Sequence, residues 1–165
     1  MGFFRRILGR DPTADWPPAD GKVPPFDPER GTFGAVRFDD ALEKLRALGR
    51  PDDLDGDVQA KCDLHYHAGG FVAECEGGKF IGVRFHFEAS RENKKVLTAS
   101  ATVGGMRLTL ATKPDDVRAW FGEPLATDAS EHGTELDYQR GKIFVMFDFD
   151  ETGRLVYFNA YLDDQ

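Results

Sequence analysis

The sequence is poor in cysteine, in long apolar runs and in positive charge, and each shortage excludes a class of protein. Two cysteines in 165 residues are too few for a small disulfide scaffold. No stretch approaches the roughly 20 apolar residues that a membrane-spanning helix needs, so no integral membrane association is expected. Lys and Arg number 21 against 29 Asp and Glu, which gives a net charge of −8. A surface that binds nucleic-acid phosphates is therefore not expected.

Signals of catalysis are equally scarce. None of the three serines lies in a Gly-x-Ser-x-Gly motif, and the paired glycines fall between predicted strands, as turn residues do. The acidic segments at residues 53–57 and 148–150 begin like calcium-binding loops. Both lack the later ligands of such a loop, which favours acidic turns. The sequence therefore predicts neither an enzyme nor a cofactor.

The first 32 residues differ in composition from the rest. Residues 3–10 combine four apolar side chains with three arginines, which suits a small amphipathic anchor or, better for so short a segment, a frayed or docked tail. Arginines stand where a secretion signal would have its apolar core, which predicts a cytoplasmic protein. Six of the nine prolines lie in residues 11–32, which excludes helix or central strand there. An extended arm that lays Trp16 and Phe26 on the body is favoured over a polyproline ligand for another protein.

A repeated pattern organises the remainder. Helical periodicity near residues 39–49 and 112–122 ends each time in Gly-x-Pro, about 73 residues apart. Apolar strands separated by glycine turns follow each helix, with Tyr66 and Tyr138 in equivalent positions. The pattern predicts an α+β fold of two tandem α-β-β-β repeats, with antiparallel sheet and short helices packed on it. The expected segments of this one compact domain are a basic N-terminal segment and Pro-rich arm at 1–32, a first repeat at 33–94, a connecting hairpin at 95–111 and a second repeat at 112–165.

These features resemble the BLIP-like fold of the beta-lactamase inhibitory protein and the SmpA/OmlA outer-membrane lipoproteins. A short helix closing in Gly-x-Pro, a Tyr-bearing strand and an apolar strand ending in Phe-Asp-x-Asp carry the resemblance, best over residues 112–161 and less closely over 39–87. The Gly-Met-Thr that usually opens the helix, the lipobox cysteine and the four-cysteine pattern are absent. The resemblance implies a fold and a tendency to bind proteins, without a specific partner.

Three histidines are candidate metal ligands. His65 and His67 share one face of a predicted strand, and hairpin pairing would place His86 on the same face with Glu74 nearby. Imidazoles and a carboxylate are ligands for zinc. An intervening strand would separate His67 from His86 by roughly 9–10 Å, so solvent-facing histidines are the favoured interpretation.

The same pairing places Cys62 opposite Cys75 on the apolar face of the sheet. Two thiols in that position could form a redox pair. Buried, reduced thiols are favoured because a cytoplasmic location is expected.

The strands of the second repeat are apolar on both faces, so both faces must be covered. The helix can cover one, and the other needs the arm, the first repeat, a second protomer or a partner. We therefore expect a non-enzymatic protein-binding module, monomeric or homodimeric, that binds another protein, preferably a basic one. An immunity or inhibitor role would fit its size and acidity. The alternative is a small-ligand or metal-binding protein that uses the groove between the repeats or the His65/His67/His86 face. The guessed partner-binding residues are Trp16, Tyr66, Tyr138, Phe144, Tyr157 and Phe158.

Overall fold

A computed structural model describes residues 11–89 and 96–163 of the chain, so the basic segment at residues 3–10 lies outside the described residues. Strands make up 46% of the described chain and helices 10%. The prediction of an α+β fold built from two α-β-β-β repeats is therefore wrong, because the protein is mostly β. Each of the two helices is too short to form a layer of its own.

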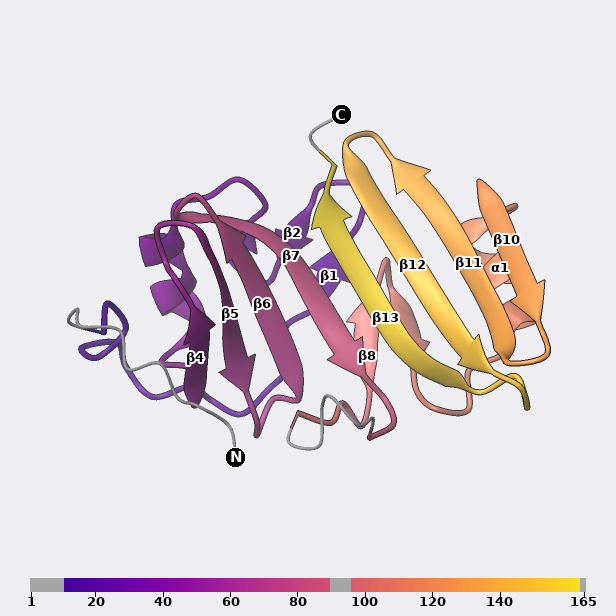
Figure 1. The fold of residues 1–165 in the computed structure, drawn as a ribbon, viewed down its shortest axis with the longest axis horizontal. Coiled ribbons are helices and arrows are strands. Elements are labelled where there is room, and N and C mark those ends of the chain that lie inside the picture. Colours follow the sequence, from indigo (N-terminus) through magenta and orange to yellow (C-terminus); the bar gives the residue numbers. More distant parts are fainter. Residues whose placement is uncertain (1–10, 90–95, 164–165) are drawn as a thin grey trace.

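The larger sheet has eight antiparallel strands in the order β10-β11-β12-β13-β7-β6-β5-β4 (Figure 1). Neither of its two edge strands, β4 and β10, was predicted, and the segment 53–57 was expected to be an acidic turn. They show no apolar alternation because each is largely exposed and pairs with a single neighbour through its backbone. The strand bounds are β4 Asp53–Gly56, β5 Lys61–Tyr66, β6 Phe71–Glu76, β7 Lys79–His86, β10 Ala126–Ser130, β11 Gly133–Arg140, β12 Ile143–Asp150 and β13 Leu155–Leu162.

The smaller sheet joins the Pro-rich arm to the hairpin at residues 101–108. Its strands lie in the order β3-β2-β1-β8-β9, and only β1 and β8 run parallel. The arm was not expected to supply a central strand, yet Phe26 pairs with both Phe33 and Val103. Strand β1 fits between Pro25 and Pro28 because it is only two residues long. The bounds are β1 Phe26–Asp27, β2 Thr32–Phe33, β3 Val36–Arg37, β8 Ala101–Val103 and β9 Met106–Leu108.

The helices are η1 (Leu42–Leu48) and α1 (Pro114–Phe121). Helix η1 is a 3₁₀-helix, which accounts for its leucines at intervals of three, since that helix has three residues per turn. Tyr66 donates a hydrogen bond from its hydroxyl to the carbonyl of Gly49, which ends η1, at 3.1 Å. Tyr138 makes the same contact with Gly122 at the end of α1, also at 3.1 Å. Each helix is thus fixed to the larger sheet at its C-terminal end.

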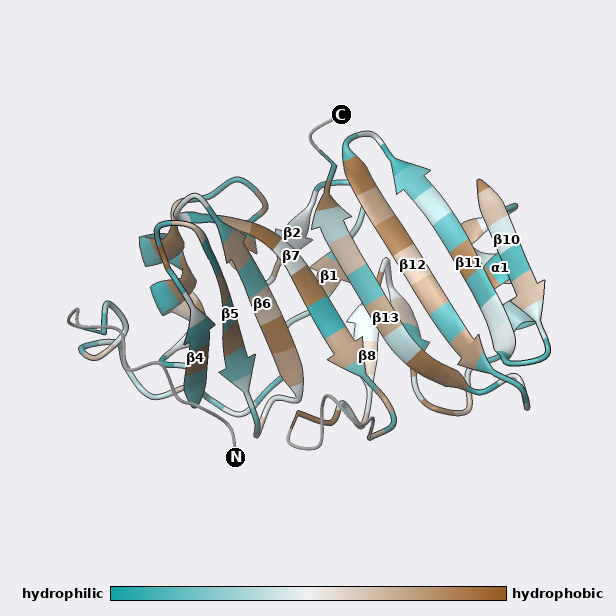
Figure 2. Cartoon of the chain, in the orientation of Figure 1, coloured by the Kyte–Doolittle hydropathy of each residue, from teal (hydrophilic) through white to brown (hydrophobic). Residues whose placement is uncertain are grey.

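The small sheet and both helices lie on one face of the larger sheet, which we call the covered face (Figure 1). Aromatic rings join the layers: Phe26 contacts Phe158 with ring centroids 6.2 Å apart, and Phe33 contacts Phe71 at 5.0 Å. Within the described chain, no element crosses the opposite face, which we call the open face. Hydropathy alternates along the strands, because successive side chains point to the two faces in turn (Figure 2).

Candidate functional site

The open face carries three rows of side chains, each defined by residues that pair across neighbouring strands. One row crosses all eight strands, from Ala126 on β10 to Asp53 on β4, and includes Asp137, Met146 and Asn159. A second row joins Asp128, Glu135, Asp148, Tyr157 and His86. The third joins Gln139, Phe144, Tyr161, Gly82, Glu74, Asp63 and Asp55.

Carboxylates dominate the part of these rows on β10 to β13, which we call the acidic half. Asp128, Glu135, Asp137 and Asp148 lie there, and none forms an ion pair with any described residue. Burial raises the pKa of Glu135, and Asp137, Asp148 and Asp128 raise it further by repulsion. Burial likewise raises the pKa of Asp137 and of Asp148. The acidic half is thus an uncompensated negative surface.

Apolar side chains and free acceptors lie among these carboxylates. Phe144, Met146 and Tyr161 are half-buried, and the rings of Phe144 and Tyr161 lie 5.2 Å apart. One carboxylate oxygen of Asp137 and the amide oxygen of Asn159 are inaccessible to solvent and accept no hydrogen bond from the described chain. The acidic half therefore combines aromatic surface, negative charge and unused acceptors.

In the other half of the open face, on β4 to β7, Arg84 of β7 pairs with two carboxylates. Its guanidinium contacts Asp63 through Nη2, and its Nε lies 2.6 Å from Oε1 of Glu74. Burial alone would lower the pKa of Arg84, but the two carboxylates raise it above its ordinary value. Burial raises the pKa of Glu74, and Arg84 opposes that shift. Burial also raises the pKa of Tyr157 to about 12.

The three candidate metal ligands are not brought together. His65 and His86 both point to the open face, but strand β6 lies between theirs. His67 follows β5, and its Nε2 lies 3.1 Å from a carboxylate oxygen of Asp53. Burial lowers the pKa of His65 and, helped by Arg84 and His65, lowers that of His86 to about 4. No group of three or more His, Cys, Asp or Glu side chains in the described residues is arranged to hold a metal ion.

The guessed partner-binding residues divide between the two faces. Phe144 and Tyr157 are on the open face. The rings of Tyr66, Tyr138 and Phe158 are buried on the covered face. Trp16, which belongs to the arm, is also buried. Sequence reasoning missed Met146, Tyr161 and the acidic side chains of the open face, although alternation along β11, β12 and β13 contained the signal.

Cys62 lies opposite Cys75 on the covered face, which confirms the predicted register. Both thiols are buried and free. A hydrogen bond from Cys75 lowers the pKa of Cys62, while the same contact and burial raise the pKa of Cys75. The pair therefore belongs to the core, away from the open face.

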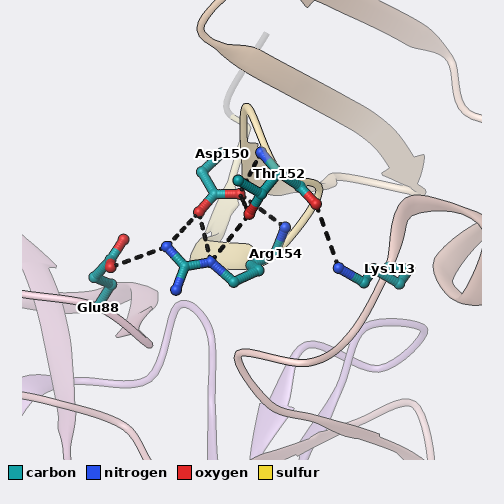
Figure 3. Close-up of polar contacts among 5 residues, drawn as sticks. All are labelled: Glu88, Lys113, Asp150, Thr152 and Arg154. Atoms are coloured by element: carbon teal, nitrogen blue, oxygen red, sulfur yellow. Dashed lines mark hydrogen bonds and ion pairs between the residues drawn. The ribbon is translucent and has the colours of Figure 1, made fainter.

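The two acidic segments that begin like calcium loops have structural roles. Asp53 and Asp55 belong to strand β4. Asp150 closes the turn between β12 and β13, where its carboxylate accepts hydrogen bonds from the backbone of Thr152 and Arg154, at 2.9 Å each, and from both side chains (Figure 3). Burial alone would raise the pKa of Asp150, but these hydrogen bonds hold it well below its ordinary value.

No protein-family model matches the sequence, and no curated protein resembles it. Solved structures of similar fold include a DUF4309 family protein (YjgB) from Bacillus subtilis, with 13% identity and a TM-score of 0.50 over 82% of this chain and 90% of that one. They also include an extracellular protein containing an SCP domain from Bacillus anthracis, with 13% identity and a TM-score of 0.53 over 77% of this chain. The alignment covers only 44% of that second protein. At this identity, the likeness shows the fold alone.

The comparison corrects two predictions. The BLIP-like resemblance is wrong, because the structural neighbours are DUF4309 and SCP-domain proteins. The Tyr-bearing strand and the Gly-x-Pro helix end suggested the wrong family because they reflect only a local contact. A tyrosine hydroxyl donates to the carbonyl at the end of a helix, and any helix packed on a sheet can form this contact. The predicted cytoplasmic location is also overturned, since a neighbour of the same fold is described as extracellular.

No helix within residues 11–89 and 96–163 is long and apolar enough to cross a bilayer. The structural comparison itself implies no specific binding role.

Proposed function

We propose that the protein is a binding module that holds another protein on the acidic half of its open face. The partner would present Lys or Arg side chains next to apolar ones. One observation carries the proposal: four carboxylates that form no ion pair with a described residue lie beside Phe144, Met146 and Tyr161, on a sheet face that no described element covers.

Electrostatics supports a cationic partner. The raised pKa values of Glu135, Asp137 and Asp148 mean that their charged forms are disfavoured in the free protein. A Lys or Arg from a partner would stabilise those charged forms and would donate to the unused oxygens of Asp137 and Asn159. Complementary charge also increases the rate of encounter and disfavours acidic competitors.

Packing supports an apolar component in the same partner. Phe144 and Tyr161 form an aromatic pair beside Met146, and aromatic residues together with Met are enriched at the centres of protein interfaces. A contiguous apolar patch within a polar rim is the usual form of a recognition surface. The acidic side chains of β10 to β12 border the patch on one side and supply that part of the rim.

Site-specific photocrosslinking tests the proposal. A photoreactive phenylalanine analogue replaces Phe144 in one protein and the exposed Gln59 in a control. We expect irradiation in an extract of the source cells to capture a discrete protein from position 144 only. The triple variant Glu135→Gln/Asp137→Asn/Asp148→Asn should lose that product. Equal capture from position 59, or capture that survives the triple substitution, would contradict the proposal.

A further inference from the structure

A cavity of about 490 Å³ lies between the Pro-rich arm and the first half of the larger sheet. Its volume is within the range of small-molecule sites. Trp16 and Pro18 line it from the arm, Leu48 and Arg50 from the end of η1, and Tyr66 and Phe71 from the sheet. Tyr66 and Phe71 belong to the covered face, so the cavity is separate from the acidic half.

The contact between the arm and Gly49 holds the walls of the cavity in place. The backbone N–H of Arg50 donates to the carbonyl of Pro17 at 2.7 Å, and Pro18 pairs with Arg50 as an isolated bridge. Gly49 has φ +85°, and a Cβ atom there would lie 2.4 Å from Cα of Ala19. The arm therefore packs where Gly49 has no side chain, and the cavity is formed before any ligand arrives.

Three buried aromatic residues, Trp16, Tyr66 and Phe71, form the inner wall of the cavity, and one of them carries an unused donor. The rings of Tyr66 and Phe71 are stacked, with centroids 4.4 Å apart and an interplanar angle of 16°. The hydroxyl of Tyr66 already donates to the carbonyl of Gly49, so it is not available to donate to a ligand. Trp16 is only 7% exposed, and its indole N–H has no hydrogen-bond partner in the described chain. This nitrogen remains accessible to solvent, so it can donate to a bound molecule.

Two cationic residues, Arg50 and Lys22, line the cavity, although the protein as a whole is acidic. Arg50 has a carboxylate of Asp11 at 3.8 Å, and both side chains are about half exposed, so this ion pair is weak. Lys22, also in the lining, makes no ion pair with the described residues. Asp52 is the one acidic residue of the lining, and its carboxylate accepts the backbone N–H of His67 at 2.7 Å. The charge of the lining is therefore positive, although the chain carries −8.

From these features we infer that the cavity is a binding site for a small aromatic carboxylate. The aromatic body would pack against Trp16, Pro18 and Leu48, above the buried rings of Tyr66 and Phe71, and its carboxylate would accept hydrogen bonds from Arg50, Lys22 and the indole N–H. The polar groups in this assignment are otherwise little used: the two cations lack strong partners, and the indole N–H lacks an acceptor in the described chain. The inference is independent of the proposed protein-binding function, which uses the opposite face.

Titration with phenylacetate tests the site, with the two indole N–H signals observed by NMR. Trp120 provides an internal control, because its indole N–H donates to Gly104 at 2.9 Å, outside the cavity, and a Trp120→Phe variant assigns the signals. We expect the Trp16 signal to shift saturably while that of Trp120 stays fixed. The neutral analogue 2-phenylethanol should bind at least tenfold more weakly, because it lacks the charge that Arg50 and Lys22 recognise.

Two substitutions and a titration with inorganic phosphate test whether binding depends on Arg50 and Lys22 and whether any anion would bind equally well. Arg50→Met keeps the backbone bond to Pro17, and Lys22→Met changes a residue without an ion pair in the described chain. Each should weaken phenylacetate binding roughly tenfold while the Trp120 signal stays in place as a check on folding. No saturable shift of Trp16 up to about 10 mM phenylacetate would overturn the inference. Equal binding of 2-phenylethanol, equal shifts with phosphate alone, or unchanged affinity in both variants would also overturn it.

Discussion

Replacing Arg84 with Met tests whether this one cation stabilises the part of the open face formed by β4 to β7. Arg84 contacts Asp63 and Glu74, and Glu74 is only 9% exposed. Removing one partner of a buried ion pair costs about 3–5 kcal/mol, because the other charge is left uncompensated. The Arg84 side chain is 24% exposed, so we expect about 3 kcal/mol at pH 8. For a chain of this length, that loss lowers Tm by about 6–12 °C.

The loss should depend on pH in a defined direction. Burial already raises the pKa of Glu74, and removing Arg84 raises it further, although the exposed Lys61 still lowers it slightly. A carboxyl whose pKa is raised in the folded state loses stability as the pH rises from its unfolded value, 4.5, through the folded value. The difference between wild type and Arg84→Met should therefore be largest at pH 8 and smaller near pH 4.5. Adding Glu74→Gln should recover much of the loss at pH 8.

Urea unfolding followed by circular dichroism at pH 4.5 and pH 8 measures these differences. Arg30→Met is the matched control: Arg30 is 81% exposed, lies 3.7 Å from Asp27 and should contribute less than about 1 kcal/mol. A loss in Arg84→Met no larger than that of the control would refute the reasoning. So would a large loss of equal size at both pH values, because it would point to lost packing rather than lost charge compensation.

Three further predictions follow from single contacts. Tyr66→Phe leaves the Gly49 carbonyl without its buried donor and should lower the free energy of unfolding by about 1–3 kcal/mol in urea; an unchanged value would contradict this role. His86 should titrate by NMR with a midpoint of about 4, and a midpoint near 6.5 would show that it is not desolvated. Because its pKa is lowered, Asp150 stabilises the fold above its unfolded value, 3.8, and loses that effect as the pH falls. Asp150→Asn should therefore be less stable than wild type at pH 6, and the gap should narrow toward pH 2; a constant gap would rule out this account.

Much of the larger sheet could be predicted from patterns among neighbouring residues. Alternating hydropathy and paired glycines predicted the hairpins of the sheet, and the register of Cys62 opposite Cys75 is confirmed. The edge strands β4 and β10 were missed because they bury no alternating face. Strand β1 was missed because proline appeared to forbid it, whereas two residues between prolines are enough to pair with β2 and β8.

The candidate site could be predicted only in part from the sequence. The sequence showed that β12 and β13 are apolar on both faces, which indicated that one face needed a further cover. It did not show that Phe158 would be covered while Phe144 would stay on the open face. That choice depends on where the small sheet packs, which is a contact between distant parts of the chain.

The sequence by itself determined the negative charge, the antiparallel hairpins and the alternation of side chains, because these depend on composition and on neighbouring residues. Only the tertiary structure decided which face of the larger sheet is covered, since Phe26 and Val103, 77 positions apart in the sequence, must meet to build the small sheet. It also decided that the arm closes over Tyr66 and Phe71 to form a cavity. Local pattern defines the strands and their two faces, whereas packing between distant segments decides which face remains open for binding.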